Sequence, residues 1–156
     1  MSVKLKDGEP LTWEDLLAFP EDNQKREIIG GELIVAPSPV RIHQRLIGRI
    51  ARLIEDAADA QDAGEMYRAP LDVRLTPYDA VQPDVLFIRT ERLGIFAPDG
   101  RITGAPDLVV EILSPGARSI DRIRTFALYA TAGVLEYWLV DPEASTVQIF
   151  ALGGDR

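Results

Sequence analysis

Residues 82–88 read QPDVLFI and residues 104–115 read GAPDLVVEILSP, two apolar stretches of strand length. Nearly continuous apolar runs of this length are typical of central strands that are covered on both faces of a sheet. Each run nevertheless carries an acidic residue in its apolar part, Asp84 in the first and Glu111 in the second. An ionised carboxylate is costly to bury alone, so each of these side chains needs a cation, a metal ion or contact with water.

The segments around these two runs predict a mixed sheet with helices packed on it. Apolar spacing predicts helices over residues 11–19, 41–59 and 119–132. Strands are predicted at about 26–29, 32–36, 66–75, 82–89 and 107–113, and then in LEYWLVD and STVQIFAL. Gly30-Gly31 suits the tight turn of a hairpin between the first two strands. We therefore predict a single α/β domain of the α+β kind over residues 1–156, with an N-terminal β-hairpin and a mixed β-sheet flanked by helices.

The composition narrows the function classes. The chain has 156 residues, of which 46% are hydrophobic and 27% charged, which is typical of a packed domain and excludes a disordered or collagen-like chain. It has no cysteine, which excludes disulfide scaffolds, thiolate metal sites and cysteine nucleophiles. No segment approaches the roughly 18 consecutive apolar residues of a membrane-spanning helix. We predict a soluble, cytoplasmic protein without a membrane partner.

The net charge disfavours nucleic-acid binding, whereas the distribution of the arginines leaves room for it. With 25 acidic and 17 basic residues the formal net charge is -8, which disfavours a chain coated in positive charge for binding phosphates. The basic residues are 14 arginines and three lysines, and no lysine follows Lys25. Four of the arginines form a stripe along the helix predicted at 41–59: Arg41, Arg45, Arg49 and Arg52. The stripe is either a solvated helix face or a surface for the phosphate backbone.

Several segments in order resemble the Uma-two family of restriction endonucleases, within the PD-(D/E)XK nuclease-like superfamily. Besides the two strands above, they are REIIGGEL at 26–33, LYATAGV at 128–134 and EYWLVDPE at 136–143. The resemblance covers about residues 12–150 and implies a restriction-endonuclease-like fold, in agreement with the mixed sheet predicted from the residues. It also implies an endonuclease that hydrolyses phosphodiester bonds in DNA with Mg²⁺ or Mn²⁺.

The resemblance makes Asp84 the aspartate of the PD motif and Glu111 the acidic residue of the third motif, and both would bind the metal. Carboxylate oxygens are ligands that Mg²⁺ and Mn²⁺ prefer. Each residue also has a simpler interpretation when taken alone. Asp84 could be a strand-entry residue after Pro83, and Glu111 could face outward from an edge strand.

The lysine of the superfamily is missing from the places where it is expected. The position two after Glu111 is Leu113, and the family supplies a lysine from the following helix, at the position of Thr125 here. Arg124 and Arg122 are the nearest cations, and we expect one of them to compensate imperfectly. Arginine stabilises phosphate charge well but does not deprotonate in proteins, so it cannot act as a base.

Two more candidates sit where the family tends to place polar residues near the site, Glu32 and His43. Glu32 could equally be a solvent-exposed strand residue, and His43 a structural residue at the border of the apolar helix face. We therefore take Asp84, Glu111, Arg124, His43 and Glu32 as the candidate catalytic residues. Asp107, which follows Pro106, is interpreted first as a strand-entry residue.

Two functions remain open from the sequence. The first is a metal-dependent endonuclease with Thr125 in the lysine position. The second is a catalytically inactive nuclease fold that serves as a binding or assembly module, favoured by the missing lysine and the acidic net charge. The chain stops at FALGGDR soon after its last predicted strand, so an uncovered sheet edge could pair two copies into a homodimer.

Overall fold

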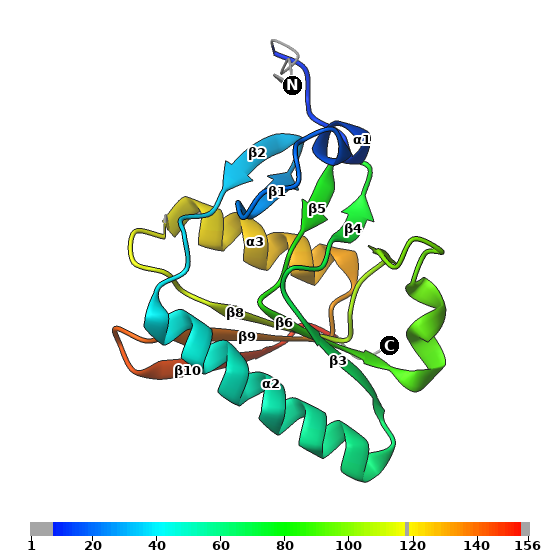
Figure 1. Ribbon diagram of the computed structural model, residues 1–156, viewed down its shortest axis with the longest axis vertical. Coiled ribbons are helices and arrows are strands. Elements are labelled where there is room, and N and C mark those ends of the chain that lie inside the picture. Colours follow the sequence, from blue (N-terminus) through cyan, green and yellow to red (C-terminus); the bar gives the residue numbers. More distant parts are fainter. Residues whose placement is uncertain (1–7, 118, 154–156) are drawn as a thin grey trace.

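The computed structural model describes residues 8–117 and 119–153, and within them three α-helices accompany two five-stranded sheets (Figure 1). The helices are α1 (Trp13–Leu17), α2 (Arg41–Gln61) and α3 (Ser119–Ala132), with one 3-10 helix, η1 (Thr90–Ile95). All three predicted α-helices are confirmed, although α1 is shorter and α2 two residues longer than the sequence pattern indicates. None of the helices in the described ranges has the length and apolar character that crossing a bilayer requires.

Sheet A begins with the predicted hairpin and has the strand order β2-β1-β5-β4-β7. Its strands are β1 (Arg26–Ile29), β2 (Glu32–Val35), β4 (Val73–Thr76), β5 (Asp79–Val81) and β7 (Ile102–Thr103). All neighbours pair antiparallel except β4 and β7, which are parallel. The hairpin turn needs glycine at position 31, because its φ is +76° and a Cβ there would lie 2.4 Å from Cβ of Pro10.

Sheet B contains the two apolar strands at its centre and has the order β10-β9-β8-β6-β3. Its strands are β3 (Gly64–Arg68), β6 (Val85–Arg89), β8 (Leu108–Ile112), β9 (Glu136–Asp141) and β10 (Thr146–Ala151). Only β8 and β9 are parallel. The mixed α/β class is confirmed, but the expectation of one sheet is wrong. The run predicted at 66–75 divides into β3 of sheet B and β4 of sheet A, separated by a segment that contains Pro70.

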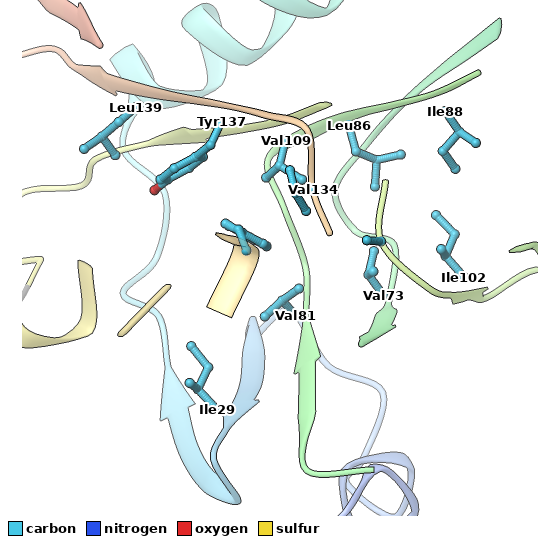
Figure 2. Close-up of a cluster of buried hydrophobic side chains, with 12 residues drawn as sticks. Ile29, Val73, Val81, Leu86, Ile88, Ile102, Val109, Val134, Tyr137 and Leu139 are labelled. Carbon is cyan, nitrogen blue, oxygen red and sulfur yellow. The ribbon is translucent and has the colours of Figure 1, made fainter. Parts of the chain in front are cut away.

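The core lies on both faces of sheet B, as the apolar runs predict. In Figure 1, α2 lies along one face of this sheet, while α3 and sheet A cover the other. Successive residues alternate between the two sides: Val85 packs with Ala51 and Ile54 of α2. Leu86 points to the opposite side and joins the cluster shown in Figure 2, where side chains from both sheets meet. Because both faces of the central strands are covered, a polar side chain on either face must contact a helix or sheet A.

Candidate active site

The two acidic residues that interrupt the apolar strands lie opposite each other. Strands β6 and β8 pair antiparallel with Val85 across from Val110, so one further step of this register sets Asp84 across from Glu111. Asp84 is 3% exposed, and its Oδ2 accepts a hydrogen bond of 2.7 Å from the backbone N–H of Ile112. The carboxylates of Asp84 and Glu111 both face one ammonium group. The expected convergence of these two residues is therefore present.

The ammonium belongs to Lys25, which immediately precedes β1. Its Nζ lies 3.8 Å from Oδ1 of Asp84, 3.7 Å from Oε2 of Glu111 and 3.5 Å from Oε1 of Glu27. The backbone carbonyl of Lys25 accepts a hydrogen bond from the N–H of Ala36, which extends the hairpin by one step and fixes the lysine in place. Position 125 holds no lysine, as the sequence shows, but the site itself does contain one.

Sequence reasoning missed both Lys25 and Glu27, although one signal was available. Residues two apart in an extended chain point to the same side. Lys25, Glu27 and the core residue Ile29 therefore share the hairpin face that packs toward sheet B. A lysine and a glutamate in phase with a core residue indicate charges directed at the interior, where they need partners.

Two further side chains hold the carboxylates from the flanking helices. His43 of α2 places Nε2 3.3 Å from Oδ2 of Asp84, so the predicted candidate does reach the site. Its Nδ1 is buried and has no hydrogen-bond partner among the described residues. From α3, the hydroxyl of Tyr129 donates a hydrogen bond of 2.7 Å to Oε1 of Glu111. Tyr129 was not among the predicted site residues.

Arg124 and Glu32 form an ion pair with each other and lie outside the cleft that contains the carboxylate pair. Nη1 of Arg124 lies 2.8 Å from Oε2 of Glu32, and Nη2 donates to the carbonyl of Ile29 at 2.7 Å. The two residues link α3 to the hairpin, and neither lines the cleft that contains Asp84. Arg124 was expected to compensate imperfectly for the missing lysine, but in this structure its guanidinium anchors the hairpin to α3.

A cleft of about 740 Å³ opens over the carboxylate pair. Its walls come from the hairpin, from α2, from the residues just before β6, from the start of α3, from the end of β8 and from β9. Arg122 and Thr125 of α3 line it together with Lys25 and Asp84. The cleft therefore offers room for a ligand beside the charged groups.

Burial and neighbouring charges give the two carboxyl groups different proton affinities. Burial alone would raise the pKa of Asp84, but His43, the Lys25 ammonium and the Ile112 amide together lower it. Burial raises the pKa of Glu111 to about 8, even though Lys25 acts in the opposite direction. Burial would lower the pKa of Lys25, but the carboxylates of Glu111, Glu27 and Asp84 raise it. At neutral pH, Asp84 and Lys25 are therefore charged, whereas Glu111 retains its proton more readily than a free glutamate.

The donor set fits an open site for a hard divalent cation. Mg²⁺ is usually held by one or two carboxylates, keeps several waters and binds substrate phosphates. Asp84 and Glu111 supply two such carboxylates, and both already face a positive charge. In the described residues no three histidine, cysteine or acidic side chains are grouped so as to hold a metal ion, which does not match a closed structural site.

Asp107 has a different environment, although it too follows a proline and is buried. Its Oδ2 accepts a hydrogen bond of 2.9 Å from the N–H of Arg89, and its Oδ1 accepts one of 2.8 Å from Nη1 of Arg92. Asp107 thus fixes the start of β8 against the end of β6, in accord with its interpretation as a strand-entry residue.

Comparisons with known proteins identify a family and a similar fold. The model of the Uma2 family, described as "Putative restriction endonuclease", matches residues 13–156. A crystal structure of a putative nuclease belonging to DUF820 from Anabaena variabilis is similar to this fold, with a TM-score of 0.79 at 23% identity, covering 94% of this chain and 82% of the other. A search of curated proteins finds no match. Restriction endonuclease-like proteins generally use divalent metal ions. The family match covers nearly the whole chain, and the protein therefore belongs to the Uma2 family of putative restriction endonucleases.

Proposed function

We propose that the protein is an endonuclease that hydrolyses phosphodiester bonds in DNA with the help of Mg²⁺ or Mn²⁺. One observation carries the proposal: the carboxylates of Asp84 and Glu111 converge on a single cation inside a cleft. A metal bound there would lower the pKa of a water molecule and stabilise negative charge on a phosphate oxygen. The cleft beside the two carboxylates would leave room for water and a substrate phosphate next to such a metal.

The neighbouring side chains prepare the two carboxylates for this task. Asp84 remains ionised at neutral pH because its pKa is lowered, and the Ile112 amide fixes the orientation of its carboxylate. The hydroxyl of Tyr129 fixes Glu111 in the same way. Metal ligands usually depend on such outer partners for their orientation.

A basic groove next to the cleft supports DNA as the substrate. The groove runs along α2 and is lined by Arg45, Arg49 and Arg52, with Arg68 from β3. Gln44 lines both the groove and the cleft, so the two adjoin. Arginines that neutralise phosphates supply sequence-independent affinity for nucleic acid, even in a protein whose net charge is -8. Three arginines of the predicted stripe thus line the groove together with a fourth, Arg68, from β3.

Cleavage of supercoiled plasmid tests the proposal directly. Wild-type protein is incubated with Mg²⁺, with Mn²⁺ or with a chelator, beside Asp84→Ala and the matched surface variant Asp59→Asn, whose side chain is exposed on α2. We expect metal-dependent nicking by the wild type and by Asp59→Asn, and a rate lower by about 100-fold or more in Asp84→Ala. Cleavage that persists in Asp84→Ala, or that appears with neither metal, refutes the proposal.

The alternative is an inactive nuclease fold that acts as a binding or assembly module. Strand β10 is at the edge of sheet B and exposes Val147 by 56% and Ile149 by 60%, and such an edge can pair two copies into a homodimer. Calorimetric titration with Mg²⁺ separates the two functions. Absence of metal binding together with a dimer that Ile149→Lys disrupts in sedimentation supports the module.

A further inference from the structure

We propose that Lys25 supplies the active-site lysine that position 125 lacks. The inference rests on the proposed nuclease function and assigns a further catalytic residue to that reaction. It concerns a residue far from Thr125 in the sequence, contributed by the chain just before the hairpin.

The placement of the ammonium is the first argument. Lys25 is the only lysine within the described ranges, since Lys4 and Lys6 fall outside them. Its side chain is about one quarter exposed and points into the cleft, where it contacts the carboxylates of Glu27, Asp84 and Glu111. A lysine that served only as a surface charge would extend into water. This lysine lies beside both proposed metal ligands.

The competing cations are the second argument. The guanidinium of Arg124 is engaged by Glu32 and by the carbonyl of Ile29, outside the cleft. Arg122 lines the cleft, but none of its hydrogen bonds or ion pairs reaches Asp84 or Glu111 among the interactions of the described residues. Among the lysines and arginines in the part of the chain that the structure describes, Lys25 alone combines a place in the cleft with contacts to both carboxylates.

The charge balance leaves room for a metal ion as well as the lysine. The single ammonium of Lys25 faces three carboxyl groups, those of Glu27, Asp84 and Glu111, so it can offset the charge of only one of them. Carboxylate oxygens beyond that one remain to hold a divalent cation. The flexible four-carbon stem of a lysine lets its ammonium turn from the carboxylates to a phosphate in the same cleft.

The role assigned to Lys25 is electrostatic. In the hydrolysis a water oxygen bonds to phosphorus while the ester P–O bond breaks, the water loses a proton to solvent, and the leaving oxygen takes one up. Lys25 keeps its own proton throughout. It donates hydrogen bonds to the phosphate oxygen on which negative charge develops, and a donor held in place beforehand stabilises that charge.

Transfer of the lysine back to the helix provides the sharpest test. Thr125 lines the same cleft as Lys25, so a lysine at position 125 can direct its ammonium into it. Plasmid cleavage is measured for wild type, Lys25→Met, the double variant Lys25→Met/Thr125→Lys, and Arg74→Met, which removes a cation of sheet A that lines neither the cleft nor the basic groove. We expect Lys25→Met to lose about 100-fold or more in rate, the double variant to recover at least about tenfold, and Arg74→Met to match wild type.

Metal affinity gives a readout that does not depend on turnover. Because Lys25→Met removes a positive charge that shares the carboxylates with the metal, we expect Mg²⁺ and Mn²⁺ to bind about tenfold more tightly in calorimetric titration. Urea unfolding verifies that each variant is folded. If Lys25→Met does not fold, Lys25→Gln replaces it, because its amide is uncharged but can still donate hydrogen bonds to the carboxylates, and the same loss and rescue are expected.

The outcomes separate this inference from the nuclease proposal. A wild-type protein that never cleaves overturns both. A wild type that cleaves while Lys25→Met stays within about threefold of its rate overturns only the role of Lys25, and so does unchanged metal affinity. A wild type that cleaves, together with a defective Lys25→Met that Thr125→Lys rescues, supports both.

Discussion

Asp84 and Asp107 each follow a proline just before a central strand, and they are 3% and 5% exposed. Similar position and burial do not give them similar partners. Asp84 faces Lys25 and His43, whereas Asp107 receives hydrogen bonds from structural groups at the ends of β6 and β8. The same substitution, aspartate to asparagine, should therefore remove function at Asp84 and stability at Asp107.

The magnitude for Asp107→Asn follows from its two acceptors. Each carboxylate oxygen accepts one hydrogen bond, so the amide of asparagine must turn its NH₂ toward either the Arg89 N–H or the Arg92 guanidinium. Loss of one charge-assisted hydrogen bond costs about 1.5–3 kcal/mol. The asparagine NH₂ then faces another N–H donor, and this unfavourable contact adds to the cost. The Arg92 side chain is one third exposed, so water recovers part of the loss. We expect about 2–4 kcal/mol less stability, or roughly 5–15 °C in Tm for a chain of this size.

Asp84→Asn should behave differently because its amide retains an acceptor for the N–H of Ile112. The variant loses its attraction to Lys25, but it also removes the charge that opposes ionisation of Glu111. These effects oppose each other, so we expect a change in the free energy of unfolding below about 1 kcal/mol. If Asp84 holds the metal as proposed, removal of its carboxylate should nevertheless abolish cleavage.

Urea and thermal unfolding of the two variants, combined with plasmid cleavage and Mg²⁺ titration, measure both effects. Asp107→Asn should unfold earlier but cleave at the wild-type rate under conditions where it is folded. The reasoning fails if Asp107→Asn is as stable as the wild type, or if Asp84→Asn is the less stable of the two variants.

Three further predictions concern the same structure. In metal-free buffer the raised pKa of Glu111, about 8, means that its proton stabilises the fold fully below the unfolded value of 4.5, and that this contribution is lost as the pH rises through 8. Glu111→Gln should therefore show a flatter dependence of Tm on pH between 5 and 8.5, and parallel profiles would contradict this. Arg49→Ala, in the inactive Asp84→Ala background, should weaken DNA binding in fluorescence anisotropy and reduce the salt slope by about one, and an unchanged slope would exclude Arg49 from phosphate contact. Gly31→Ala should lower the free energy of unfolding in urea by about 1–3 kcal/mol or more, since its φ is +76° and the new Cβ meets Pro10 at 2.4 Å; wild-type stability would show that the turn adapts.

Local patterns predicted most of the fold. Alternation and helical spacing identify the hairpin, the three α-helices and the two central strands, because each of these signals lies within one segment. The division into two sheets depends on which strands pair, and residues 66–75 carry no local sign of the break between β3 and β4 except Pro70. Strands β5 and β7 have three and two residues, too few for a periodic pattern.

The site residues could be predicted from the sequence where a charged side chain interrupts an apolar segment. A carboxylate inside an apolar strand stands out in the sequence, which identifies Asp84 and Glu111. Lys25 lies in a polar segment where a lysine is ordinary, and its role depends on how the hairpin packs against sheet B. The environment of Arg124 is likewise decided by a tertiary contact with Glu32, which helical periodicity alone does not reveal.

The ammonium of Lys25 and the carboxylates of Asp84 and Glu111 come from opposite sides of the boundary between the hairpin and sheet B. A nascent or partly opened chain in which sheet B has formed, but the hairpin has not docked, would hold both acids and lack the lysine. If Lys25 acts as proposed, the protein can cut DNA only while the hairpin is docked on sheet B. Detachment of one small hairpin would then silence the enzyme well before the sheet itself unfolds.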